Sequence, residues 1–256
     1  MFILAAMKKK YRGVYLFISS IVISLIHLSF GFARNTGHLV REVLHTTDSS
    51  IHNNNDSLLF TPEIKSVYDS LQLNLKGLSR EAFDYAKKGL DQLAAQGRLM
   101  NQSIISIVDF SLPSTEKRLF VIDLNHYKIL FNTLVAHGRN SGKEMAFAFS
   151  NQHSSFKSSP GFYTTAETYM GKNGLSLRLQ GLENGINDNA LERGIVIHGA
   201  DYVNAGLANA QGYIGRSQGC PAVPAREAFP IINQIKNGTL LFIYHPAYIK
   251  RSVLLN

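Results

Sequence analysis

The feature that most constrains the fold is a series of short apolar runs that begins at residue 104. Each run is rich in isoleucine, valine, leucine or aromatic residues, and turn-forming residues separate one run from the next. The runs are residues 104–110, 118–124, 128–135, 161–165, 175–179, 194–198 and 240–244. No helices alternate with them, so a doubly wound parallel sheet is not expected. The pattern predicts a mainly β fold, a sandwich or barrel, with one helix over residues 225–236 that is kinked or restarted at Pro230.

A helical segment is predicted before the first strand. Ser79 is a helix cap, and Gly97 is a stop signal. Between them an apolar stripe has helical spacing, and it consists of Ala82, Phe83, Ala86, Leu90, Leu93 and Ala94. Thr61-Pro62-Glu63 has the features of an earlier helix start. We therefore expect two short helices in an N-terminal extension over residues 58–100, followed by the main domain over residues 101–256.

The first 33 residues have the layout of a secretory signal peptide. Lys8, Lys9, Lys10 and Arg12 precede a mostly apolar stretch from Val14 to Phe30, and Gly31-Phe32-Ala33 offers small residues at a cleavage site. The stretch contains several serines and is short for a membrane span, which needs roughly 20 apolar residues. The alternative is an uncleaved anchor with transient membrane association. The layout predicts export to the periplasm, and the polar residues 34–57 predict a flexible tether.

Composition excludes several classes of function. The net charge falls from +8 to +4 if residues 1–33 are removed, because that segment holds four basic and no acidic residues. The mature chain has no stripe of arginine and aromatic residues, so no nucleic-acid partner is expected. It has no glycine-rich phosphate motif, and histidines 38, 45 and 52 lack metal-ligand spacing. We expect no cofactor and no metal; the oligomeric state is left open.

Cys220 is the only cysteine, so it cannot form a disulfide within the chain. It follows Gly219 and precedes Pro221 on a predicted turn, and His198 ends the strand-like run 194–198. A histidine can take the thiol proton and so generate the nucleophilic thiolate. The two residues can meet only if the intervening loop folds back. Gly219 would let a substrate carbonyl approach backbone N–H groups, including that of Cys220, which are candidates for stabilising an oxyanion.

The segments around these residues resemble a known family. His198-Gly199, a loop, and Ser217-Gln218-Gly219-Cys220-Pro221-Ala222 are similar to the signature of L,D-transpeptidases with a YkuD-type catalytic domain, in the branch where Pro-Ala follows the cysteine. Residues 135–142 and 158–163 resemble segments that precede the active site in that branch. The likeness covers roughly residues 100–245, and the helical residues 61–97 resemble the branch's N-terminal extension.

The resemblance implies a β-rich fold and a reaction on peptidoglycan stem peptides. The cysteine would attack the L,D bond of a tetrapeptide stem and release the terminal D-alanine. The acyl group would then pass to an amine of another stem, giving a 3-3 cross-link, or to another amine. In this reading Cys220 is the nucleophile and His198 the base. The Gly199 carbonyl would orient the imidazole, and Ser217 and Gly219 would frame the cysteine turn.

The chain departs from the family pattern at two positions beside the cysteine. Many members have histidine where this chain has Gln218, and arginine or asparagine where it has Ala222. Gln218, Arg216, Arg139 and Tyr163 are candidate substrate-binding residues. Arg216 can also be a solvated or structural arginine, and Tyr163 can also pack in the core. His137-Gly138, a second His-Gly pair, either lines the cleft or belongs to a structural turn.

Three functions are compatible with these residues. The first is a peptidoglycan L,D-transpeptidase. The second is an L,D-carboxypeptidase or endopeptidase with the same nucleophile, because water and an amine compete for one acyl-enzyme. The third is a peptidoglycan-binding module without activity, which the unusual Gln218 makes possible.

Overall fold

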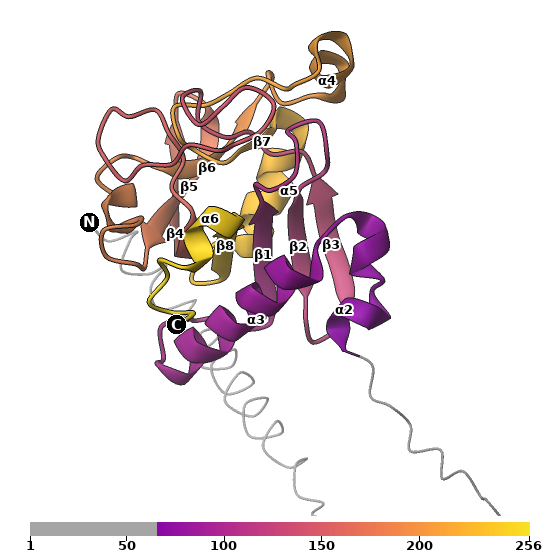
Figure 1. Cartoon of the computed structure of the whole chain (residues 1–256), viewed down its shortest axis with the longest axis vertical. Coiled ribbons are helices and arrows are strands. Elements are labelled where there is room, and N and C mark those ends of the chain that lie inside the picture. The colour runs from indigo at the N-terminus through magenta and orange to yellow at the C-terminus, as the bar shows by residue number, and fades with distance from the viewer. Residues whose placement is uncertain (1–65) are drawn as a thin grey trace, which may run out of the picture. The chain divides into compact units, whose positions relative to one another are not determined.

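The computed structural model describes residues 66–256, and the expectations for residues 1–65 (the signal, the tether and the first helix start) lie outside the described residues. Eight strands form one sheet in the order β3-β2-β1-β8-β4-β5-β6-β7 (Figure 1). The strands are β1 (Ile104–Asp109), β2 (Leu119–Asp123), β3 (Lys128–Thr133), β4 (Gly161–Gly171), β5 (Gly174–Gly181), β6 (Val196–Ala200), β7 (Ala222–Pro224) and β8 (Leu240–Tyr244). The helical elements are α2 (Val67–Ser70), η1 (Leu73–Lys76), α3 (Arg80–Ala95), η2 (Asp188–Ala190), α4 (Ala205–Gln211), α5 (Ala225–Ile235) and α6 (Pro246–Ile249).

The sheet is mixed, and it is nearly closed into a barrel. β1 pairs with β8 in parallel, and β6 pairs with β7 in parallel, whereas the other neighbours are antiparallel. The segment after the edge strand β3 reaches the opposite edge, where Ala136 pairs with Ala222 of β7 and its N–H donates to the Ala222 carbonyl at 2.8 Å. This bridge joins the two ends of the strand order. The predicted mainly β, barrel-like fold is confirmed.

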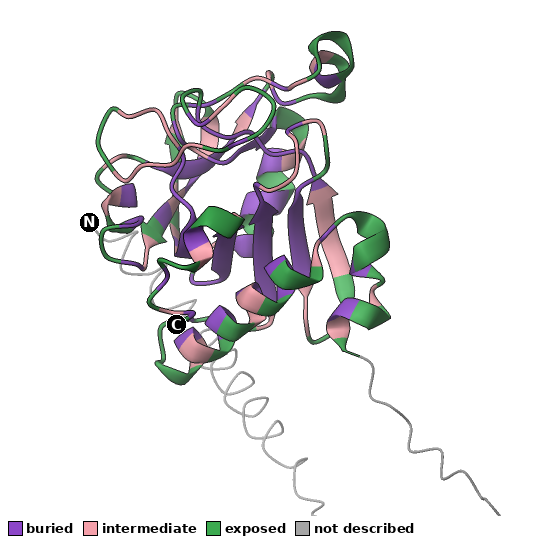
Figure 2. Ribbon diagram, in the orientation of Figure 1, coloured by how far each residue is buried: buried purple, intermediate pink, exposed green. Residues whose placement is uncertain are grey.

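Strand periodicity explains why helices cover both faces of the sheet. Ile105 and Ile107 of β1 pack in one hydrophobic cluster with α3, whereas Ile104 and Val108 pack in a second cluster with α5. Successive side chains of a strand point to opposite faces, so a strand that is apolar throughout is covered on both sides. β1 and β8 are buried along their length, and the edge strand β3 is partly exposed (Figure 2).

α3 forms as the apolar stripe predicts. The Ser79 hydroxyl accepts a hydrogen bond from the Ala82 N–H at 3.1 Å, which caps the first turn. The stripe residues Ala82, Phe83, Ala86, Leu90 and Leu93 are buried, and the chain turns away at Gly97 with a φ of 66°. The helix packs in the same cluster as residues of β1, β4 and β8, so the helical segment and the sheet share one core.

Several elements differ from their predicted form, and three of them lie after β6. α5 continues through Pro230 without restarting, because Pro230 and the preceding Phe229 lie on the exposed side of the helix. The missing N–H would have bonded to the carbonyl of Arg226 in the first turn, where water can take its place. α4 was not predicted; Asn204 caps this helix, and its side chain accepts a hydrogen bond from the Leu207 N–H at 2.8 Å. The three-residue strand β7, which begins two positions after Cys220, was also not predicted.

Candidate active site

The cysteine turn and the histidine meet at the β6–β7 end of the sheet. His198 lies on β6 opposite Ala222 of β7, and Cys220 precedes β7 by one residue. Parallel pairing of β6 and β7 therefore returns the chain to the histidine after the α4 loop. Both side chains line one cavity of about 480 Å³. The loop closure that the sequence required is present.

The histidine is held in one tautomer. His198 is buried, and its Nδ1 lies 2.9 Å from the Gly199 carbonyl oxygen. A carbonyl oxygen can only accept a hydrogen bond, so Nδ1 carries a proton, and in the neutral ring the lone pair is on Nε2. The backbone carbonyl of Gly199 thus orients the imidazole in the way that the resemblance implied. A histidine in this tautomer can accept a proton at Nε2.

Ser217 shapes the turn that presents the thiol. Its hydroxyl accepts from the Gly219 N–H at 3.0 Å and donates to the Cys220 carbonyl at 2.6 Å. Gly219 has a φ of 125°, and a Cβ there would lie 2.9 Å from the Lys157 carbonyl oxygen. Only glycine fits this conformation and this close approach. Ser217 and Gly219 are therefore positioning residues of the turn, and the Gly219 N–H is already used within it.

Residues that are distant in the sequence hold the cysteine turn in place through hydrogen bonds. The Ser158 hydroxyl donates to the Gly219 carbonyl at 3.1 Å and accepts from the Gly138 N–H at 3.0 Å. The Ser158 N–H in turn donates to the Ser141 hydroxyl at 2.9 Å. Ser141 and Ser158 are buried, so this network fixes the backbone around the thiol without access to water.

The thiol lies in a mixed environment. Cys220 is half-buried, and burial raises the pKa of its thiol. Interactions with the Val196 N–H, the Arg193 guanidinium and the cysteine's own N–H oppose this and lower the pKa of the thiol. The thiol Sγ also lies 3.8 Å from the Gly194 carbonyl. Because burial favours the neutral thiol, a base such as His198 is needed to form the thiolate.

Arg193 and Val196 are site residues that the sequence analysis missed. Arg193 donates to the Ser150 carbonyl at 2.8 Å and the Lys157 carbonyl at 2.7 Å, and it bonds to the hydroxyls of Ser159 and Ser155. It thereby fastens the loop 150–159 beside the cysteine turn. The weak signal was a basic residue just before the predicted strand-like run that ends at His198.

The predicted substrate-binding residues fall into two groups. Arg139, Arg216 and Gln218 are exposed and line the cavity with Cys220. Tyr163 does not line it: the side chain is fully buried in the core, and its hydroxyl donates to the Ser159 carbonyl at 2.8 Å. The prediction that Tyr163 contacts substrate is wrong, because β4 turns this side chain toward α5. Tyr169, farther along β4, lines the cavity instead.

His137 belongs to the scaffold. It is fully buried, its Nδ1 accepts from Arg118 at 2.7 Å, and its carbonyl accepts from the Ser217 N–H at 2.9 Å. Of the two interpretations of the second His-Gly pair, the structural one is correct. Gly138 is needed there, since a Cβ would lie 2.5 Å from the Phe156 carbonyl oxygen.

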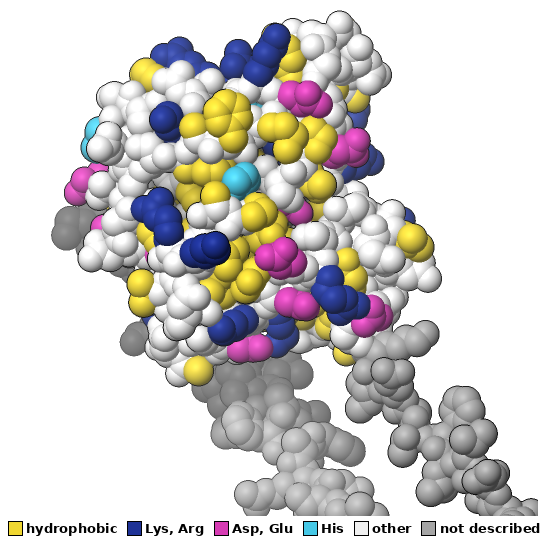
Figure 3. Space-filling model, in the orientation of Figure 1, with side chains coloured by type: hydrophobic (Ala, Val, Ile, Leu, Met, Phe, Trp, Pro, Cys, Tyr) yellow, Lys and Arg dark blue, Asp and Glu magenta, His cyan; other side chains and the backbone are white. Residues whose placement is uncertain are grey.

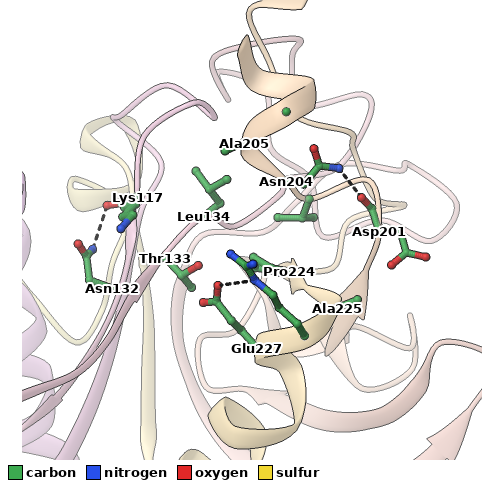
Figure 4. A pocket seen from close by; sticks show the side chains of 13 residues that line it. Lys117, Asn132, Thr133, Leu134, Asp201, Asn204, Ala205, Pro224, Ala225 and Glu227 are labelled. Carbon is green, nitrogen blue, oxygen red and sulfur yellow. Dashed lines mark hydrogen bonds and ion pairs between the residues drawn. The ribbon is translucent and has the colours of Figure 1, made fainter. Parts of the chain in front are cut away.

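A second cavity, of about 510 Å³, lies between α4, the start of α5 and the end of β3 (Figure 4). Glu227 forms an ion pair with Arg226 at 3.7 Å. The Asn204 side chain donates to the Asp201 carbonyl, and a dashed line marks this hydrogen bond in Figure 4. The lining holds neither cysteine nor histidine, so this cavity lacks a thiol–imidazole pair. Within residues 66–256, no group of three or more histidine, cysteine, aspartate or glutamate side chains could hold a metal ion. No helix in the same range is long and apolar enough to span a membrane.

Comparison with known proteins gives a family for the chain. The family described as the L,D-transpeptidase catalytic domain matches residues 74–244, which is more than half of the sequence. The match begins within η1 and ends with β8, and it contains every residue of the cysteine turn. No curated protein matches the sequence.

Several solved structures are similar to part of the chain. They include an L,D-transpeptidase from Mycobacterium smegmatis, at 12% identity and a TM-score of 0.37, with 56% of this chain and 59% of that chain covered. The K307A mutant of the helical cell shape determining protein Pgp2 from Campylobacter jejuni has 14% identity and a TM-score of 0.40, with 66% and 57% covered. An L,D-transpeptidase (Yku) from Stackebrandtia nassauensis has 14% identity and a TM-score of 0.34, with 61% and 65% covered.

This chain covers less than two thirds of the length of each of those structures. The assignment therefore rests on the sequence match, which spans the sheet and the cysteine turn. The chain belongs to the family of L,D-transpeptidase catalytic domains.

Proposed function

We propose that the chain is a cysteine-dependent peptidoglycan L,D-transpeptidase that acts on tetrapeptide stems. The observation that carries the proposal is the shared cavity of Cys220 and His198, with the imidazole held as a base by the Gly199 carbonyl. The family assignment supports the reaction type. Cys220 is the only cysteine in the sequence, so no other thiol competes for the role.

The proposed reaction has two steps at one carbonyl. His198 takes the thiol proton, and Sγ attacks the carbonyl of the third residue of the donor stem. The Cys220 N–H and the nearby Val196 N–H are the candidate donors for the oxyanion. The carbon–nitrogen bond to the terminal D-alanine breaks, and His198 returns the proton to the leaving amine. The amine of a second stem then attacks the thioester, loses a proton, and releases the thiol, which leaves a 3-3 cross-link.

The first test is acylation by a carbapenem, followed by intact mass. The wild-type protein is expected to gain one adduct, and Cys220→Ala none. His198→Ala should slow adduct formation by about 100-fold or more, because general-base catalysis contributes about that much. Thermal unfolding of each variant serves as the control for folding. A wild-type protein that gains no adduct would overturn the cysteine mechanism and favour the non-catalytic binding module.

The second test identifies the acceptor. Purified tetrapeptide muropeptides are incubated with the protein, and products are separated by mass. Cross-linked dimers are the expected product, and they should be absent with Cys220→Ala. Trimmed stems without dimers would show that water is the acceptor, which makes the protein an L,D-carboxypeptidase. Cleavage of preformed cross-links would show an endopeptidase.

Export to the periplasm is part of the same proposal, because the stems are outside the cytoplasm. It rests on the signal-like residues 1–33 of the sequence. Fractionation of cells, with N-terminal sequencing of the protein, tests it. A first residue at or near Arg34 is expected after cleavage, whereas an intact N-terminus in the membrane fraction would indicate the anchor.

A further inference from the structure

The cavity around Cys220 has an unusual charge. Four cationic side chains line it, namely Arg139, Lys172, Arg193 and Arg216, and no aspartate or glutamate does. None of the four takes part in an ion pair with a described residue. On the molecular face shown in Figure 3, by contrast, acidic and basic side chains are interspersed. A cavity that is lined by positively charged side chains, with no acidic side chain to neutralise them, favours an anionic ligand.

The four cations differ in how free they are to bind a ligand. The terminal nitrogens of Arg193 already donate to two carbonyls and two hydroxyls. Lys172 is exposed in the turn between β4 and β5. The Arg139 guanidinium makes no hydrogen bond to any described residue, and it lies over the Phe156 ring, 4.0 Å from its centroid. Arg139 is therefore oriented but has its donors free.

The loop that presents Phe156 is held in a conformation that non-glycine residues rarely adopt. Ser154 and Phe156 both have a φ of 54°. Two hydrogen bonds from Asn140, the residue after Arg139, hold this loop. The Asn140 N–H donates to the Phe156 carbonyl at 3.1 Å, and the Asn140 side chain donates to the Ser155 carbonyl at 2.9 Å. Strained residues of this kind persist where the surroundings determine them, commonly at functional sites. Here the strain places an aromatic ring beneath an arginine at the edge of the cavity.

Arg216 is joined to the same corner. Its Nη1 donates to the Arg139 carbonyl at 3.3 Å and to the Gly142 carbonyl at 3.2 Å. This leaves Nε and Nη2 without a described partner. The Arg216 guanidinium thus contacts the backbone of Arg139, and both arginines line the cavity of the nucleophile. Because a guanidinium presents parallel N–H donors, it matches the two oxygens of a carboxylate.

We propose that Arg139, whose guanidinium lies over the Phe156 ring, and Arg216 form a subsite that binds a carboxylate of the donor stem. This subsite selects stems in which that group is a free carboxylate over stems in which it is a carboxamide. The inference rests on the proposed function, since it names the charge state of the substrate for the same cavity. A carboxamide is neutral, and its NH₂ group faces the arginine N–H groups donor to donor, so it loses one of the two hydrogen bonds and the charge. The subsite would act before the chemical step, on binding.

The test measures binding without turnover. A synthetic tetrapeptide stem, and versions of it in which each carboxylate in turn is replaced by a carboxamide, are titrated by calorimetry into Cys220→Ala. One carboxamide is expected to weaken binding by about tenfold or more, which corresponds to about 1.4 kcal/mol. In Cys220→Ala with Arg139→Gln, the free stem should bind as weakly as that carboxamide, and the difference between them should disappear. Equal binding of all the stems to Cys220→Ala would overturn the subsite.

Two further variants separate the effect of the Phe156 ring from that of charge alone. Phe156→Leu keeps both arginines but removes the ring, so discrimination should fall although the net charge is unchanged. Arg226→Gln removes an exposed arginine of α5 that does not line the cavity, and discrimination should persist. If Phe156→Leu discriminates like its parent, the Phe156 ring has no role. If Arg226→Gln abolishes discrimination, general charge and not the subsite is responsible.

Turnover by the protein with Cys220 intact distinguishes this inference from the proposed function. Cross-linking at equal kcat/KM from free and amidated stems would overturn the subsite and leave the function in place. Absence of binding by every stem, together with absence of product and of a carbapenem adduct, would overturn both.

Discussion

At the scale of single residues, the cysteine turn shows which parts of a motif are chemical and which are geometric. Ser217 and Gly219 have a geometric role, because they hold the backbone that presents Cys220. These roles agree with the residue types that the sequence analysis selected. Arg193 and Val196 were not predicted, because the sequence around them does not indicate a contact with Cys220. The contact arises in the fold, where β6 and the residues before it lie beside the cysteine turn.

Arg193 offers a prediction at this scale. Its guanidinium lowers the pKa of the Cys220 thiol against the effect of burial. Replacement by the uncharged Arg193→Met should therefore raise the pKa of the thiol, so that alkylation by iodoacetamide reaches its half-maximal rate at a higher pH. Arg193→Lys keeps the charge and should restore most of the profile. The measurement is the alkylation rate of Cys220 as a function of pH.

A merely structural role for Arg193 would give a different result. Loss of its hydrogen bonds to the loop 150–159 would lower stability in both variants, because a lysine ammonium cannot reproduce the guanidinium fork. The pH profile would then stay in place while the unfolding temperature fell. Equal profiles for the wild type and Arg193→Met would contradict the electrostatic role.

At the scale of elements, the sequence predicted most where a long periodic pattern was buried. The stripe of α3 and the apolar runs of β1, β2, β3 and β8 agree with their observed bounds to within about two residues. β7 was missed because it has only three residues, and its place is set by pairing with β6 and not by its own pattern. α4 was missed because its glycines and alanines also suit a loop. Short elements next to the site are thus the least predictable ones.

Packing between α3 and β4 leads to a prediction for an element. Gly89 faces the fully buried Phe162 ring, and a Cβ at residue 89 would lie 2.1 Å from the ring edge. The ring cannot easily move, because it stacks on Phe242 with centroids 4.3 Å apart. Gly89→Ala should gain about 1 kcal/mol of helix propensity and lose about 1–3 kcal/mol through overpacking. A net decrease in the free energy of unfolding is expected, measured by urea denaturation.

The double variant is the matched control. In Phe162→Leu the smaller side chain leaves room, so adding Gly89→Ala should cost less than it does in the wild type, or should stabilise the helix. The difference between the two costs is the coupling energy of the pair. If Gly89→Ala stabilises the wild type by the full helix propensity, the Phe162 ring does not oppose a side chain at residue 89.

At the scale of the whole molecule, the closure of the sheet depends on residues between the strands. The sequence predicted a mainly β fold, but it could not give the strand order, because each strand pattern suits any central position. The order follows from long-range contacts such as the Ala136–Ala222 bridge and the parallel pairing of β1 with β8. Beneath the bridge, the buried Arg118 donates to the carbonyls of Val135 and Leu112. Through these contacts Arg118 holds the segment after β3, which carries Ala136, against the segment after β1.

His137 makes the stability of this assembly depend on pH. Arg118 can only donate, so His137 Nδ1 must accept, and the neutral ring donates from Nε2 to the Gly142 carbonyl at 3.3 Å. Burial and the positive charge of Arg118 lower the pKa of His137 to about 3. An unfolded chain has a histidine pKa of about 6.5. Below that value the unfolded state binds a proton that the folded state excludes, so the free energy of unfolding falls as pH falls.

The prediction compares the wild type with His137→Asn, which removes the titrating group. The stability advantage of the wild type should shrink by about 1 kcal/mol between about pH 7 and pH 5.5, since one excluded proton costs up to about 1.4 kcal/mol per pH unit. Urea denaturation at each pH measures it. Asp109→Asn is the control of opposite sign: burial raises the pKa of Asp109, so the wild type should gain relative to this variant as pH falls below that raised pKa toward the ordinary aspartate range. Parallel pH curves for the wild type and His137→Asn would show that His137 takes up its proton in the folded state. The Arg118–His137 contact would then have to break at low pH without unfolding the protein.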